Sequence, residues 1–115
     1  MFIAGDFFDA LADETRRRML ALITREGELC VCELHYALDV LQPKVSRHLA
    51  ILRDAGLLSM RREGTWIFYR INSALPAWAL TILDTMNPVW QSMPNCQQDY
   101  QRLMVMINRP VSCCG

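Results

Sequence analysis

The sequence predicts a mainly α-helical fold with one β-hairpin, in a single domain that spans residues 1–115. Apolar residues recur at helical spacing through the first half of the chain and again after Pro76. Between these regions the pattern alternates around a central glycine, which is typical of a hairpin. The expected order is therefore α-α-α-α-β-β-α, with a thin core because small domains bury a smaller fraction of their surface.

The first three helices are expected before residue 40. A short apolar helix covers about Asp6–Ala10, and a second begins after Asp13, which is a suitable N-cap. Apolar residues of this second helix repeat at helical spacing from Met19 to Ile23, and Gly27 ends it. A third helix follows from about Cys30 to Leu38, and a turn then leads to residue 42.

A fourth helix is expected from about residue 42 to residue 55, where Gly56 stops it. Pro43 suits its first turn, because the missing N–H of a proline does no harm there. One face is apolar, with Val45, Leu49 and Leu52. The opposite face is polar and basic, with Lys44, Ser46, Arg47 and, nearer the flank, His48. Two short helices joined by a tight turn, the second with a basic open face, describe a helix-turn-helix.

The hairpin is expected over residues 58–71, because aromatic and β-branched residues surround Gly64. A helix-turn-helix followed by a basic hairpin, or wing, is a winged helix. From about residue 76 to residue 108 the sequence predicts a last, apolar helix that is interrupted at Pro88 and Pro94. So much apolar surface is best buried against a second copy of the chain, and we expect a homodimer. The alternative is that this helix folds back on its own domain.

The zero net charge conceals an uneven distribution along the chain. Residues 1–40 hold four arginines against eight acidic residues, whereas residues 41–72 hold six basic residues against two acidic ones. The middle of the chain is therefore a cationic region suited to contact with phosphates. A solvated basic surface would have the same composition, so the charge alone does not decide between the two interpretations.

The cysteines indicate both the chemistry of the chain and the cellular compartment in which it occurs. There are five, an odd number: Cys30, Cys32, Cys96, Cys113 and Cys114. Two pairs are too close in sequence for ordinary structural disulfides, so they indicate metal binding or redox sensing in a reducing compartment. Apolar runs fall short of the ~20 residues that cross a bilayer, and the first residues do not resemble a signal peptide. We therefore expect a cytoplasmic protein.

Three segments together closely resemble the ArsR/SmtB family: Glu28-Leu29-Cys30-Val31-Cys32-Glu33-Leu34, Gln42-Pro43-Lys44-Val45-Ser46-Arg47-His48-Leu49 and Arg62-Glu63-Gly64-Thr65-Trp66. The similarity runs from about Phe8 to Trp78 and is strongest to arsenic-responsive ArsR repressors. It implies a dimeric winged-helix repressor that occupies double-stranded operator DNA and dissociates when an inducer binds. The inducer implied is trivalent arsenic or antimony, as arsenite or a methylated arsenical, held by cysteine thiolates without an organic cofactor.

The resemblance also assigns contacts to DNA and between subunits. On the fourth helix the DNA contacts are Gln42, Lys44, Ser46 and Arg47, with His48 beside them, and on the wing they are Arg62, Gly64 and Thr65. Lys44 and Arg47 could each bind phosphate or recognise guanine, and the sequence leaves both roles open. Dimerisation is assigned to the first and last helices.

For the inducer, the resemblance points to Cys30 and Cys32, which in relatives are joined by a third cysteine three residues further on. His35 stands at that position here, which puts a site of three thiolates in doubt because trivalent arsenic prefers sulfur. A further ligand could come from His35, from Cys96, or from the two cysteines of the flexible tail expected at residues 109–115. Two thiols would suit a monomethylated trivalent arsenical, whereas arsenite would gain from a third.

The spacing of the first two thiols suggests how they act as a switch. Residues i and i+2 project about 200° apart on a helix, so Cys30 and Cys32 cannot hold one ion while the helix start is regular. Inducer binding should therefore unwind or shift that first turn. Because the turn supports the recognition helix, a dimer would lose the half-site spacing of about one DNA turn that it requires.

Other functions remain open on the sequence. Cysteine oxidation could trigger release without a metal, and cadmium or lead sensing is another alternative, although it would want thiols ahead of Cys30. Zinc or nickel sensing is disfavoured because neither histidine lies on the last helix. A protein that sequesters arsenicals would show no sequence preference on DNA. An enzyme is not expected, since the sequence offers neither a nucleophile with an evident base nor a glycine-rich phosphate loop.

Overall fold

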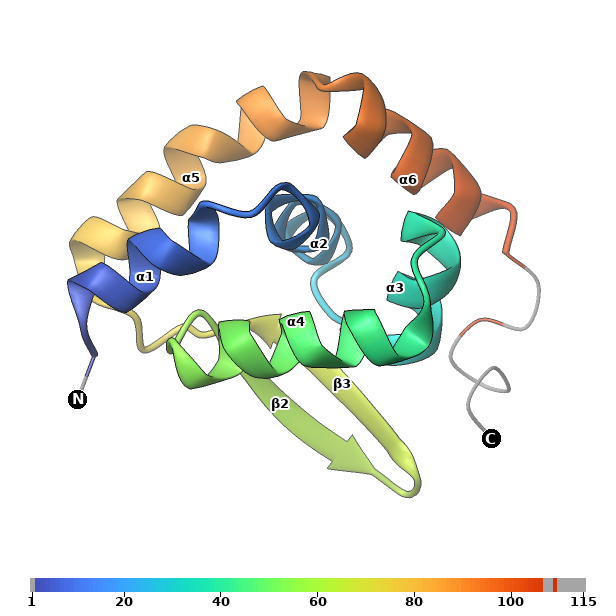
Figure 1. Ribbon diagram of the computed structural model, residues 1–115, viewed down its shortest axis with the longest axis horizontal. Helices are drawn as coiled ribbons and strands as arrows, with labels where there is room; N and C mark the ends of the chain where they lie inside the picture. Colours follow the sequence, from blue (N-terminus) through green and yellow to red (C-terminus); the bar gives the residue numbers. More distant parts are fainter. Residues whose placement is uncertain (1, 107–108, 110–115) are drawn as a thin grey trace.

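Helix α2 lies at the centre of the molecule, and the other elements surround it (Figure 1). The computed structural model describes residues 2–106 and 109. In chain order the elements are α1 (Ala4–Leu11), α2 (Glu14–Glu26), β1 (Leu29–Cys30), α3 (Val31–Leu38), α4 (Gln42–Asp54), β2 (Leu58–Glu63), β3 (Trp66–Ile71), α5 (Ala77–Ser92) and α6 (Pro94–Met104). Helices α5 and α6 arch over α2, while α4 and the β2–β3 hairpin lie on its other side (Figure 1). Within the described residues, no helix is long and apolar enough to cross a membrane.

The bounds of α2 follow from two local signals that the sequence predicts. Asp13 is the N-cap, and its carboxylate accepts the backbone N–H of Arg16 at 3.0 Å. Burial acts to raise the pKa of Asp13, but this hydrogen bond and nearby positive charge outweigh it and lower the pKa. Gly27 ends the helix at a φ of 90°, which glycine adopts without strain. The run Met19–Ile23 is buried throughout, so α2 supplies the middle of the core.

The sheet has three antiparallel strands in the order β1-β3-β2. The expected hairpin is confirmed, with a two-residue turn in which Gly64 has a φ of 64°. Strand β1 is not predicted by the sequence. Its two residues pair with β3, and Cys30 lies opposite Phe68. A strand of two residues is too short to show a period, so only its partner reveals it.

The last part of the chain forms two helices where the sequence predicts one over residues 76–108. The break falls at Met93, which is extended (φ −74°, ψ 138°), because a residue before proline is pushed out of the helical region. Pro94 then lies in the first turn of α6. The interruption expected at Pro88 is wrong, since α5 continues through it. With β1 included, the order becomes α-α-β-α-α-β-β-α-α.

Candidate functional site

Helix α4 presents an open polar face, as the sequence predicts. The turn before it contains Asp39 at a φ of 55°, a left-handed conformation that aspartate tolerates. Leu41 occupies the N-cap position and is 77% exposed, and Pro43 follows in the first turn. The side chains on the open face are Gln42, Lys44, Ser46 and Arg47, and all four are exposed. The apolar residues Val45, Leu49 and Leu52 are buried on the other side.

His48 is not on the open face, which corrects the expectation that it lies beside the DNA contacts. It is 6% exposed, and its Nδ1 lies 3.3 Å from a guanidinium nitrogen of Arg16. Its Nε2 has no hydrogen-bond partner among the residues that the structure describes. Burial lowers the pKa of His48 and favours the neutral ring. The spacing could have shown this, since Val45, His48 and Leu52 recur at i, i+3 and i+7 on one helical stripe.

The wing carries two kinds of arginine. Arg62, Gly64 and Thr65, which the resemblance assigns to DNA contact, are exposed. Arg61, which the sequence analysis missed, turns instead toward the base of β1. Its Nε donates to a carboxylate oxygen of Glu28 at 2.8 Å, and another of its nitrogens donates to Glu63 at 2.7 Å. These hydrogen bonds raise the pKa of Arg61 and tie the wing to the segment that leads into Cys30.

Cys30 and Cys32 lie where β1 passes into α3. Cys30 is the N-cap of α3 and is 1% exposed, whereas Cys32 is half-buried in the first turn. Glu33 completes a capping box, because its Oε1 accepts the backbone N–H of Cys30 at 2.9 Å. Cys30 is extended (φ −94°, ψ 170°), so the argument from helical projection does not apply to it. The strand-to-helix junction, rather than a regular helical turn, separates the two cysteines.

The candidate third ligands lie in different places. The Nδ1 of His35 is 2.7 Å from the carbonyl oxygen of Val40, so this ring holds the turn between α3 and α4. Cys96 is buried on α6, where burial raises its pKa, and it borders a cavity of about 380 Å³ lined also by Glu14, Arg17, Arg18, Trp90, Met93, Pro94 and Asn95. Cys113 and Cys114 lie outside the described residues. Within those residues, no group of three or more His, Cys, Asp or Glu side chains is arranged to hold a metal ion.

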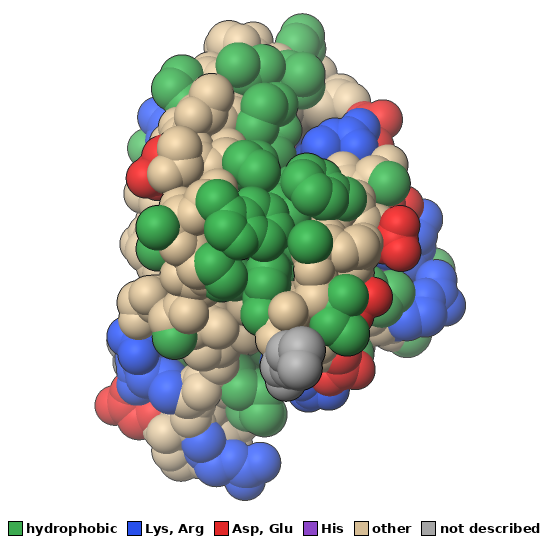
Figure 2. Space-filling view, turned by 90° about the vertical axis from the view of Figure 1, so that its left-hand side faces the viewer, with side chains coloured by type: hydrophobic (Ala, Val, Ile, Leu, Met, Phe, Trp, Pro, Cys, Tyr) green, Lys and Arg blue, Asp and Glu red, His purple; other side chains and the backbone are tan. Residues whose placement is uncertain are grey.

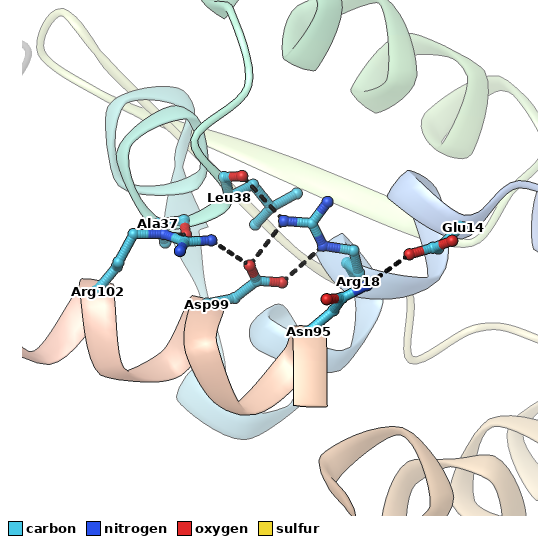
Figure 3. A network of polar contacts seen from close by, with 7 residues as sticks. All are labelled: Glu14, Arg18, Ala37, Leu38, Asn95, Asp99 and Arg102. Atoms are coloured by element: carbon cyan, nitrogen blue, oxygen red, sulfur yellow. Dashed lines mark hydrogen bonds and ion pairs between the residues drawn. The ribbon is translucent and has the colours of Figure 1, made fainter. Parts of the chain in front are cut away.

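A buried ionic network holds the carboxyl end of α3 (Figure 3). The side chain of Asp99, on α6, is 1% exposed and accepts hydrogen bonds from Arg18 at 2.7 and 2.9 Å and from Arg102 at 2.8 Å. The same arginines cap α3. Arg18 donates to the carbonyl of Leu38 at 2.9 Å, and Arg102 to that of Ala37 at 2.6 Å. The hydrogen bonds that Arg18 donates to Asp99 raise the pKa of Arg18. The network therefore joins α2, α3 and α6 just ahead of the turn into α4.

Two short helices, the second with an exposed polar face, and a hairpin beside them define a winged helix-turn-helix, a class of DNA-binding domain. Residues 13–59 match a family model described as "Bacterial regulatory protein, arsR family". Arsenic resistance transcriptional regulator ArsR1 of Pseudomonas putida is 50% identical over 91% of this chain and 80% of its own length. The chain belongs to the arsR family, whose members are transcriptional regulators rather than enzymes.

Two further relatives support the same assignment. The arsenical resistance operon repressor of Escherichia coli is 44% identical over 94% of this chain and 86% of its own length. Among solved structures, an antimony-specific transcriptional repressor, AntR, is 34% identical, with a TM-score of 0.60 over 72% of each chain. The likeness of both sequence and fold confirms the family that the sequence analysis named.

Proposed function

We propose that this protein is a homodimeric transcriptional repressor that binds double-stranded operator DNA in the cytoplasm. It leaves the DNA when trivalent arsenic or antimony binds cysteine thiolates. The observation that carries the proposal is the junction of β1 and α3, where Cys30 is the N-cap and Cys32 lies in the first turn of the helix that leads into the recognition helix. The names of the relatives, an arsenical resistance operon repressor and an antimony-specific repressor among them, support the same function.

The DNA interface consists of the open face of α4 and the tip of the wing. Lys44 and Arg47 supply positive charge, and Gln42 and Ser46 supply hydrogen-bonding groups at the end of α4 that enters the major groove. Leu41 has no polar side chain to cap α4, Pro43 has no N–H, and Lys44 donates its N–H to the carbonyl of Leu41 at 3.0 Å, so phosphate contacts of this helix depend on its side chains. Arg62 and the tip residues Gly64 and Thr65 lie near the flanking minor groove. His48 is left out of this interface because it is buried.

The dimer interface consists of an apolar face on α1 and α5. Figure 2 shows apolar side chains gathered over this side of the molecule. Phe8 stacks on Trp78 with ring centroids 6.1 Å apart, yet the two are 53% and 42% exposed, and Val89 is 45% exposed. Trp90 on α5 and Leu103 on α6 are buried within the chain, so the last two helices also supply the core. Burial against a second copy would remove the exposed patch from water.

Release follows from the burial of Cys30. Because Cys30 is 1% exposed, an inducer can reach its sulfur only when the junction of β1 and α3 opens. Opening breaks the hydrogen bond from Cys30 to Glu33 and the pairing of Cys30 with Phe68. A displaced α3 moves α4 with it, so the two recognition helices of the dimer no longer match successive turns of DNA. A hundredfold loss of operator affinity needs only ~2.7 kcal/mol of coupling between the two sites.

Fluorescence anisotropy of a labelled operator tests the proposal directly. The DNA is taken from the region upstream of the protein's own gene and is titrated with arsenite, antimonite or a monomethyl trivalent arsenical. Wild type should dissociate, and a Cys30→Ser/Cys32→Ser variant should stay bound at every inducer concentration. Reductant added without metalloid should not change operator binding. If reductant instead reversed a release that occurred without metalloid, a thiol redox sensor would be supported. Failure of every metalloid to release the wild-type protein would refute the proposed function.

The DNA interface has its own test. Lys44→Ala and Arg47→Ala should each weaken operator binding, and each should lower the slope of log K against log[salt] by about 1 if the side chain contacts a phosphate. A side chain that recognises guanine should instead relax sequence preference at one base pair. Arg53→Ala is the matched control, since Arg53 is exposed on the same helix outside the proposed interface. An equal effect of Arg53→Ala would show that only general charge matters.

A further inference from the structure

Arg61, on β2, contacts both sides of the junction that holds Cys30. Its Nε donates to Oε2 of Glu28 at 2.8 Å, and its Nη2 donates to the other oxygen of the same carboxylate. Glu28 stands two positions before Cys30 in the chain. The guanidinium carbon of Arg61 also lies 4.7 Å from the centre of the Phe68 ring, and Phe68 is the residue of β3 that pairs with Cys30. One side chain of the wing therefore touches the segment before Cys30 and the strand partner of Cys30.

The register of the sheet explains this contact. Arg61, Phe68 and Cys30 are successive partners across the strands β2, β3 and β1. Residues directly opposite one another in an antiparallel sheet are neighbours on one face, with Cβ atoms about 4.5–5.5 Å apart. A row of three side chains thus runs from the wing to Cys30, which is 1% exposed at the buried end of the row. Displacement of Cys30 removes one member of this row.

Arg61 differs from the neighbouring Arg62 in what binds its charge. A second carboxylate, that of Glu63, accepts a hydrogen bond from Nη1 of Arg61 at 2.7 Å, so two acidic side chains bind the guanidinium. The hydrogen bonds from Arg61 lower the pKa of Glu28, so this carboxylate is ionised at neutral pH. Arg62 is exposed and is among the residues proposed to contact DNA. The charge of Arg61 is thus paired within the protein rather than offered to a phosphate.

We propose that Arg61 is a positioning residue that couples the thiol junction to the wing, and that it holds the wing in its DNA-binding arrangement only while Cys30 is paired with Phe68. The inference rests on the proposed function and adds a second route by which the inducer acts. Metalloid binding separates Cys30 from Phe68 and shifts Glu28, so the wing loses two of its fixed contacts at once. The inducer therefore weakens the DNA contacts of the wing as well as those of α4.

Operator affinity measured by anisotropy, with and without inducer, tests this role in the full chain. The probe is a monomethyl trivalent arsenical at a concentration that saturates the wild-type response, or arsenite if only arsenite releases wild type. Arg61→Ala should raise the inducer-free Kd about two- to fivefold, the range that a partly exposed ion pair supports, and should leave the Kd with inducer unchanged. The reason is that inducer-bound wild type has already lost the contacts that the substitution removes. The ratio of the two Kd values, which measures the coupling, should fall by the same factor.

Salt dependence separates a positioning residue from a DNA contact. Arg62→Ala, the matched control on the same strand, should lower the slope of log K against log[salt] by about 1 if Arg62 contacts a phosphate. Arg61→Ala should leave this slope unchanged, because the charge of Arg61 is already paired with Glu28 and Glu63.

Glu28→Gln provides a test in which the two explanations predict opposite signs. Removal of a negative charge near DNA should strengthen binding by general electrostatics, whereas loss of the pair with Arg61 should weaken inducer-free binding. The double variant Glu28→Gln/Arg61→Ala should match Arg61→Ala alone, because both substitutions remove the same contact. Circular dichroism checks that each variant is folded.

The outcomes separate this inference from the proposed function. If no metalloid releases the wild-type protein, the proposed function fails and the inference fails with it. If wild type is released but Arg61→Ala binds operator as tightly as wild type, or is weakened equally with and without inducer, the positioning role is overturned while the proposed function stands. Tighter inducer-free binding by Glu28→Gln would overturn it as well, since Glu28 would then act only through its charge.

Discussion

At its carboxyl end α3 is held by charge, and at its amino end by a thiol, a carboxylate and a strand of two residues. Three side chains secure the carboxyl end, where Arg18 and Arg102 cap the helix and share the buried carboxylate of Asp99 (Figure 3). The amino end depends on Glu33 and on the pairing of Cys30 with β3.

The difference between the two ends of α3 distinguishes the end that stays in place from the end that can be displaced. Breaking a buried ion pair leaves a charge without its partner, which is strongly unfavourable, so the carboxyl end has one stable arrangement. The amino end is held by one capping box, a short strand and the pair of Glu33 with the partly exposed Arg109, each of which contributes a modest free energy. Bond formation between sulfur and a metalloid can therefore displace it. The carboxyl end of α3 stays joined to α2 and α6, so under the proposed release α3 turns about this end when its amino end is displaced.

The largest expected effect is at Asp99. Asp99→Ala should lower the free energy of unfolding by about 3 kcal/mol, because it leaves Arg18 and Arg102 without their shared carboxylate. Arg102 is partly exposed, so water offsets some of the loss. Urea unfolding followed by circular dichroism measures the change, with the exposed Asp84→Ala on α5 as control. Equal changes in the two variants would show that the network does not hold α3.

A smaller effect is expected at Glu33. Glu33→Ala should lower the free energy of unfolding by about 1–2 kcal/mol, through loss of the capping box and of the pair with Arg109. Glu33→Gln keeps an oxygen acceptor for the N–H of Cys30 and should lose less. Urea unfolding under the conditions used for Asp99 gives the comparison. If Glu33→Ala proved more damaging than Asp99→Ala, the ranking of the two ends would be reversed.

The elements that the sequence predicts are those with local causes. Asp13 and Gly27 bound α2 through an N-cap and a positive φ, and Gly64 marks the hairpin turn. The open face of α4 follows from helical spacing, and the same spacing, applied to His48, would have placed that residue inside. The interruption expected at Pro88 is wrong, because packing can hold a proline within an apolar helix. The break falls instead before Pro94.

The parts that the sequence does not predict depend on distant partners. Strand β1 exists because β3 pairs with it, and Arg61 turns away from the wing tip because Glu28 attracts it. The pair of Arg18 with Asp99 joins residues 81 positions apart, and the pair of Arg109 with Glu33 joins residues 76 positions apart, so charge patterning along the chain does not reveal them. The thiol pair was found by its residue types, but its setting at a strand-to-helix junction came only from the structure.

The pH dependence of the free energy of unfolding probes the packing beneath α4, the helix that follows α3 in the chain. Burial lowers the pKa of His48 below its usual 6.5; Asp13 acts to raise it, and the positive charges of Arg16, Lys44 and Arg47 lower it further. The unfolded chain therefore binds a proton at higher pH than the folded chain does. The stabilisation is present above pH 6.5 and is lost as pH falls through 6.5 toward the lowered value.

Urea unfolding at pH 7.5, 6.5 and 5.5 should show this loss in wild type. His48→Gln cannot titrate, so its free energy of unfolding should change less over the same interval. The carboxylate of Asp13, whose pKa is lowered from 3.8, changes the free energy of unfolding only at lower pH and does not affect this comparison. Equal pH dependence in both proteins would mean that His48 is not held neutral beneath α4.

The smallest change in stability is expected at Cys30, the residue on which the proposed release depends most. A serine hydroxyl is a better N-cap than a thiol, whereas the smaller side chain gives up some apolar contact at a position that is 1% exposed. These effects oppose each other, so Cys30→Ser should change the free energy of unfolding by less than about 1 kcal/mol. Release by a monomethyl trivalent arsenical should nevertheless be lost. If Cys30→Ser instead destabilised the protein as much as Glu33→Ala, the amino end of α3 would depend on the thiol for its fold, and loss of release could no longer be assigned to lost metalloid binding.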